Sequence, residues 1–127
     1  MSTAVKDLIA WQKAMDLVEL VYRFTAKLPK EELYGLTSQM RRSAVSIASN
    51  IAEGQGRNSK GEFYQFLGNA RGSIEELRTQ VLIAQRLRFV LDPEVQKVLE
   101  QVERVARLVN GLMQAVKPKV LRATAGE

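Results

Sequence analysis

Few residues in this chain of 127 are of the types that perform catalysis, because it contains neither cysteine nor histidine. That composition excludes thiolate nucleophiles, imidazole bases, Ser-His-Asp triads and zinc sites built from cysteine and histidine. Two adjacent acidic pairs remain, Glu31-Glu32 and Glu75-Glu76. Neighbours on a helix point about 100° apart, so neither pair forms a carboxylate dyad. The residues therefore predict a protein that is not an enzyme and that holds no metal, cofactor or small-molecule substrate.

The stretch from Gly54 to Arg57 resembles a glycine-rich phosphate loop only loosely. It follows an expected helix rather than a strand, and it lacks the Gly-Lys-Ser/Thr ending of a P-loop. Its two glycines suit a turn between helices, and that is our interpretation of it.

The chain carries an excess of basic residues, 19 against 14 acidic ones, and a formal net charge of +5. A basic surface binds phosphate backbones without sequence specificity. The residues that we predict to contact RNA or DNA are Arg41, Arg42, Arg57, Lys60, Lys117 and Lys119. We expect the first four to lack local acidic partners. The alternative for Arg41 and Arg42 is a structural ion pair within the fold or between subunits.

The positions of proline, glycine and capping residues predict four helices, at about 5–28, 36–53, 60–89 and 93–116. Ser59 and Glu62 form the pattern of a capping box, and Asp92 is expected to cap a helix that has Pro93 at its first position. Four long helices with short joints indicate an all-α, up-and-down four-helix bundle. We expect this bundle to occupy 1–116 as one domain, followed by a flexible basic tail at 117–127.

Targeting and membrane signals are not found in the sequence. Lys6 and Asp7 interrupt any signal-peptide pattern, and no run approaches the roughly 20 apolar residues of a spanning helix. Apolar residues make up 46% and charged residues 26%, as in ordinary globular proteins. We expect a cytoplasmic protein with no membrane partner.

The first expected helix is apolar over an unusually wide arc of about 240°. One side of a four-helix bundle does not cover so much surface, and large exposed apolar patches are rare on monomers. We therefore predict a subunit interface there, with Leu17, Leu20 and Phe24 as candidates. The alternative is that the joint at 29–34 folds back and shields the helix. Trp11 and Tyr22 fit the same apolar arc, so no aromatic platform for stacking bases is evident.

Two further patterns lie on the second and third helices. Polar stripes at helical spacing predict that Asn50 and Glu53 are at least partly buried and bonded to the third helix or the adjoining loop; the alternative is a solvated face. The structural polar motif comprises Asn50, Glu53, Ser73 and Glu76. The glycines at 61, 68 and 72 share one side of the third helix, where we expect close helix packing rather than a ligand groove.

Several motifs follow the order of one known family. They read LIAWQKAM at 8–15, LP at 28–29, ELYGLTSQMRR at 32–42, SIASNIAEG at 46–54 and GSIEEL at 72–77. Together they resemble the bacterial four-helix-bundle proteins encoded in intervening sequences of 23S ribosomal RNA genes. The accessory variability determinant of diversity-generating retroelements belongs to the same group. The resemblance runs from residue 6 to about 116 and leaves out the tail.

The resemblance implies a homopentameric ring with a basic surface. Its retroelement branch implies binding to a reverse transcriptase and to nucleic acid, while the ribosomal-insert branch leaves the function unassigned. Two functions therefore stay open for this sequence. One is a nucleic-acid-binding accessory protein, and the other is a protein–protein scaffold with no nucleic-acid role.

Overall fold

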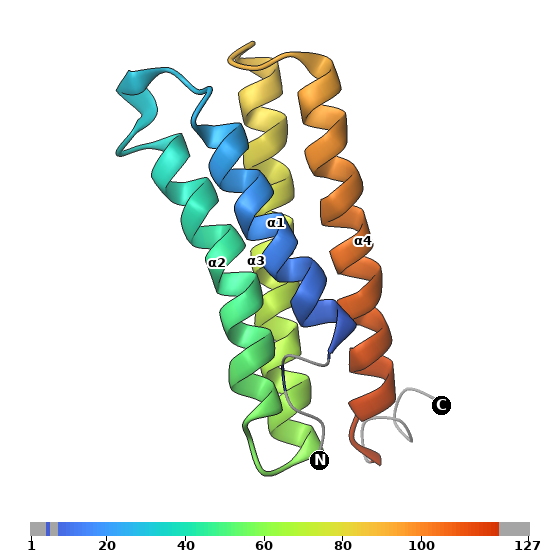
Figure 1. The fold of residues 1–127 in the computed structure, drawn as a ribbon. Helices are drawn as coiled ribbons and strands as arrows, with labels where there is room; N and C mark the ends of the chain where they lie inside the picture. Colours follow the sequence, from blue (N-terminus) through green and yellow to red (C-terminus); the bar gives the residue numbers. More distant parts are fainter. Residues whose placement is uncertain (1–4, 6–7, 120–127) are drawn as a thin grey trace.

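The computed structural model describes residue 5 and residues 8–119, and these residues fold as a helical bundle (Figure 1). The helices are α1 (Ile9–Thr25), α2 (Leu36–Gln55), α3 (Lys60–Arg86) and α4 (Asp92–Val116), with a short 3-10 helix η2 (Lys30–Glu32) between α1 and α2. Each helix packs on the next, and α4 returns to pack on α1. No strand occurs among the described residues. The all-α four-helix bundle predicted from the sequence is confirmed.

Two helices are shorter than the sequence suggested. α1 ends at Thr25 rather than near 28, and α3 ends at Arg86 rather than near 89. Arg88 adopts a left-handed conformation with φ of 60°, and the Phe89 N–H donates to the Ala84 carbonyl at 3.1 Å. This hydrogen bond is the one that closes a Schellman motif, which usually has glycine at the left-handed position. Because arginine occupies this position here, the sequence contains no glycine that would mark the end of α3.

The two predicted helix caps differ in outcome. The Glu62 N–H donates to Ser59 Oγ at 3.1 Å, and Ser59 Oγ donates to Glu62 Oε1 at 3.3 Å, so Ser59 caps α3 as expected. At α4 the capping position is Leu91, and Asp92 already lies inside the helix. The Asp92 carboxylate instead accepts a long hydrogen bond from Gln85 Nε2 at 3.4 Å.

The core contains one buried stripe from each helix. In α4 the stripe is nearly all valine, and its members follow one another at intervals of three and four residues: Val95, Val98, Val102, Val105, Val109, Met113 and Val116. In α1 the stripe includes Leu17 and Phe24, which are 0% and 3% exposed. Both therefore pack within the single chain and offer no surface to a second copy, which corrects their assignment to an interface. Leu20 is half-buried against the same core.

Close packing of α2 on α3 depends on a glycine other than those expected. A Cβ at Gly54 would lie 2.8 Å from both Phe63 Cδ1 and Phe66 Cβ. A Cβ at Gly68 or Gly72 would meet nothing within 4 Å. The packing role predicted for those two glycines is therefore wrong within one chain.

An ion cluster ties α3 to α4. Arg78 Nε donates to Glu103 Oε1 at 2.7 Å and Nη2 donates to Glu103 Oε2 at 3.1 Å, while Nη1 contacts Glu75. The hydrogen bonds to Glu75 and Glu103 raise the pKa of Arg78, although partial burial opposes them. No described helix is long and apolar enough to cross a membrane.

Candidate nucleic-acid interface

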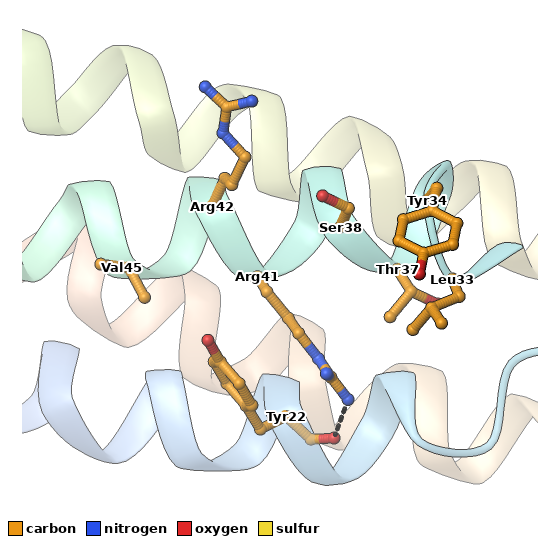
Figure 2. Close-up of a pocket in the computed structure, with 8 residues that line it drawn as sticks. All are labelled: Tyr22, Leu33, Tyr34, Thr37, Ser38, Arg41, Arg42 and Val45. Carbon is orange, nitrogen blue, oxygen red and sulfur yellow. Dashed lines mark hydrogen bonds between the residues drawn. The ribbon is translucent and has the colours of Figure 1, made fainter.

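An open groove of about 620 Å³ lies where the start of α2 faces α1 (Figure 2). It is lined by Tyr22, Leu33, Tyr34, Thr37, Ser38, Arg41, Arg42 and Val45. No acidic side chain is in this lining. Tyr34 stands at the groove's end and is 93% exposed. The groove therefore combines aromatic surface with two cations.

The joint between α1 and α2 holds Tyr34 in this position. Pro29 begins the 3-10 turn, and the Gly35 N–H donates to the Glu32 carbonyl at 3.0 Å. The Glu32 carboxylate then accepts a hydrogen bond from the Leu36 N–H at 3.2 Å. Glu32 thus satisfies a free N–H in the first turn of α2, where a negative charge is favoured.

Arg41 is engaged by α1. Its Nε donates to Thr25 Oγ1 at 2.8 Å, its Nη2 donates to the Tyr22 carbonyl at 3.4 Å, and its guanidinium carbon lies 4.5 Å from the centre of the Tyr22 ring. Thr25 is buried and donates to the Val21 carbonyl at 2.8 Å. A cation at the C-terminal end of a helix also interacts favourably with the helix dipole. These contacts support the structural alternative for Arg41.

Arg42 points the other way, away from α1 (Figure 2). It is exposed, and it forms no hydrogen bond or ion pair with any residue in the described part of the chain. It lines the groove on one side of α2 and a polar slot on the other side. Of the two adjacent arginines, only Arg42 has its charge free for a ligand.

The remaining predicted contacts lie at the opposite end of the bundle. Arg57 pairs with Glu53 at 3.6 Å and Glu62 at 4.0 Å, so its expected lack of acidic partners is wrong. Lys60 is exposed at the start of α3. Pro118 Cγ would lie 3.9 Å from a Cβ at Gly61, which places Lys117 and Lys119 near Lys60. These three lysines thus belong to segments that meet at this end of the bundle, about 20 Å from Arg42 along α2.

The polar motif between α2 and α3 is built around two serines. Ser46 Oγ and Ser73 Oγ share a hydrogen bond of 2.8 Å, and half-buried Asn50 donates from Nδ2 to the Ser46 carbonyl at 2.9 Å and to Ser46 Oγ at 3.0 Å. Asn50 therefore bonds within α2, to Ser46, and it is Ser46 that bonds to Ser73 of α3. Glu53 is exposed rather than partly buried, and its partner Arg57 lies in the adjoining turn. Glu76 is exposed as well.

Sequence reasoning missed Tyr34, which the structure makes the most exposed large apolar residue described. The available signal was a single aromatic residue between Glu32 and Gly35, in a joint too short to bury it. Residues 120–127 of the expected tail lie outside the described residues.

Comparison with known proteins supports the fold and identifies the family. A family model described as 23S rRNA-intervening sequence protein matches residues 6–111. A solved structure from Bacteroides thetaiotaomicron VPI-5482, described as a protein with unknown function from the S23 ribosomal protein family, superposes with a TM-score of 0.77. It is 16% identical, and the match covers 83% of this chain and 98% of that one. No curated protein matches the sequence. Because the family model spans most of its length, the chain belongs to the 23S rRNA-intervening sequence protein family.

Proposed function

We propose that this protein is a non-enzymatic, homo-oligomeric protein that binds single-stranded RNA or DNA in the groove between α1 and α2. The observation that carries the proposal is Tyr34, 93% exposed beside two arginines in a groove without acidic lining. Proteins that bind single strands combine aromatic side chains, on which bases stack, with cations that follow the phosphates. Tyr34 supplies the stacking surface and Arg42 the cation.

Tyr22 extends the stacking surface into the groove. Its ring is 43% exposed, and Arg41 lies against it at 4.5 Å. Because the Arg41 guanidinium lies over the ring, it restricts the movement of the ring before any ligand arrives. A base that stacks there loses little entropy to ordering of the protein.

The charge of the whole molecule favours the same class of partner. The net charge is +5, and the lysines at the far end of α2 add a second positive surface. A homopentameric ring, as the family resemblance implies, would repeat both surfaces five times and strengthen long-range attraction of a polyanion. The proposal also includes a protein partner, the reverse transcriptase that the resemblance to the retroelement branch implies.

Fluorescence anisotropy with a labelled single strand, measured over a series of salt concentrations, tests the proposal. We expect Tyr34→Ala to weaken binding by about 5- to 150-fold, the equivalent of one stacked base, while Tyr34→Phe keeps the wild-type affinity. Leu91→Ala, at a 71% exposed position in the α3–α4 joint, serves as the control for loss of exposed apolar surface.

Two results would contradict nucleic-acid binding in this groove. One is equal affinity of the Tyr34→Ala and Tyr34→Phe variants. The other is a slope of log affinity against log salt near zero, because each phosphate contact to a single strand adds about 0.7 to that slope. A zero slope would favour the scaffold function, with a peptide held by Leu33 and Val45 in the same groove.

A further inference from the structure

α1 packs on α4 as well as on α2, and a second hollow, of about 250 Å³, opens between α1 and α4. We call this hollow the α1–α4 cleft. The residues of each helix that line it are spaced by three and four positions, so they lie side by side on one helix face. They are Leu20, Arg23, Phe24 and Lys27 of α1, and Glu94, Lys97 and Val98 of α4.

The bottom of the cleft is apolar. Phe24 and Val98 close it from below, at 3% and 1% exposed, and Leu20 is half-buried against the same core. The aliphatic stems of lysine and arginine extend such a surface, while their charged ends stay in water. A volume of about 250 Å³ is smaller than most sites for whole small molecules. The cleft therefore suits a single apolar side chain of a larger partner.

The rim of the cleft is positively charged. Lys27 Nζ and Glu94 Oε1 form an ion pair at 2.9 Å, so the one carboxylate in the lining is already engaged. Arg23 lies one turn before Lys27 on α1, and Lys97 lies one turn after Glu94 on α4. Both are exposed, and neither forms a hydrogen bond or ion pair within the part of the chain that the structure describes. Two cations on facing helices are thus available to a ligand.

We infer that the α1–α4 cleft binds an acidic segment of a partner protein, with one apolar side chain against Leu20 and carboxylates beside Arg23 and Lys97. A central apolar anchor within a charged rim is common where proteins bind peptides. A nucleic-acid strand suits this cleft less well, because its one aromatic residue, Phe24, is too covered to stack with a base. The cleft and the groove use different faces of α1, so the inference does not rest on the proposed function.

Fluorescence anisotropy of the whole chain with a labelled synthetic peptide tests the inference. The probe contains one phenylalanine among aspartates and glutamates. One control peptide has alanine in place of the phenylalanine, and the other has asparagine and glutamine in place of the acids. We expect the alanine peptide to bind about 30-fold more weakly or worse, the equivalent of one anchoring hot spot. We expect the uncharged peptide to lose the salt dependence of binding.

Glu94→Gln separates a binding role from a structural one, because it should strengthen binding. It removes the carboxylate from the cleft and frees Lys27, so we expect about two- to fivefold tighter binding of the acidic peptide. Glu100→Gln, at an exposed position of α4 outside the cleft, changes the net charge equally and should not have this effect. Circular dichroism checks that both variants are folded.

Substitution of the exposed cations gives the converse result. Lys97→Gln should weaken binding of the acidic peptide by about two- to fivefold, and Arg104→Gln, on the outer face of α4, should not. Three outcomes would each overturn the inference: equal affinity of the phenylalanine and alanine peptides, equal affinity of Glu94→Gln and Glu100→Gln, or full displacement of the peptide by single-stranded DNA. Peptide binding without any binding of nucleic acid would retain the cleft and contradict the proposed groove function alone.

Discussion

Arg41 and Arg42 are neighbours in the sequence but have different roles. Successive residues on a helix point about 100° apart, so one side chain faces α1 and the next faces solvent. The partners of Arg41 lie 16 and 19 positions earlier in the chain. The spacing of residues within one helix does not predict contacts with another helix. For this reason the sequence alone left either role open for both arginines.

Substitution of each arginine by glutamine separates these roles. Arg41→Gln loses hydrogen bonds from a charged donor, and we expect it to lower the free energy of unfolding by about 1–3 kcal/mol. Arg42→Gln should change stability by less than about 0.5 kcal/mol and reduce the salt slope of strand binding by about 0.7. Urea denaturation and anisotropy measure the two effects.

A matched exposed cation provides the control for Arg42. Arg104, on the outer face of α4, also lies in the solvent. If Arg104→Gln lowers the salt slope as much as Arg42→Gln does, phosphate binding is spread over the surface and the groove holds no special site.

At the scale of the helices, small residues decide how closely α2 approaches α3. An added Cβ at Gly54 would meet Phe66 Cβ at 2.8 Å and the Phe63 carbonyl at 3.3 Å, and neither atom is the end of a flexible side chain. We expect Gly54→Ala to lower the free energy of unfolding by about 1–3 kcal/mol through overpacking. Chemical denaturation measures the change.

Gly68 is the control position on α3. Nothing lies within 4 Å of an added Cβ there, so Gly68→Ala should raise the free energy of unfolding by about 1 kcal/mol through helix propensity alone. A loss of stability at Gly68 would mean that a second chain packs on this face in the native assembly.

Elements with a repeating pattern were predictable from the sequence, and elements fixed by single contacts were not. The valine stripe of α4 and the Ser59–Glu62 cap follow from spacing, and the structure contains both. The end of α3 depends on Arg88 in a conformation that arginine rarely adopts. The groove depends on Tyr34, whose exposure follows from tertiary folding of the joint and leaves no periodic signal.

At the scale of the whole molecule, the wide apolar arc of α1 has two halves. One half, with Leu17 and Phe24, lies in the core of the single chain. The other half contains Met15 and Tyr22, which are 40% and 43% exposed, and half-buried Trp11. If α1 contributes to a subunit interface, it does so through Met15 and Trp11, because Tyr22 lines the groove.

Light scattering after size-exclusion chromatography tests the assembly. We expect an oligomer, most simply the ring of five, that Met15→Glu converts to folded monomers because a charge is costly to bury in an apolar interface. Leu17→Glu should unfold the chain instead, since that side chain is fully buried. Leu91→Glu, at a 71% exposed site, should leave the mass unchanged. A wild-type monomer at micromolar concentration would contradict the ring.

The position of Arg42 between the groove and the polar slot has a thermodynamic consequence. A ligand that contacted Arg42 on one side of α2 would change the charge or the rotamer that a ligand on the other side meets, so two such binding equilibria would be linked. Linkage is reciprocal: the factor by which a ligand in the groove altered affinity on the other side of α2 would equal the factor by which a ligand there altered affinity in the groove.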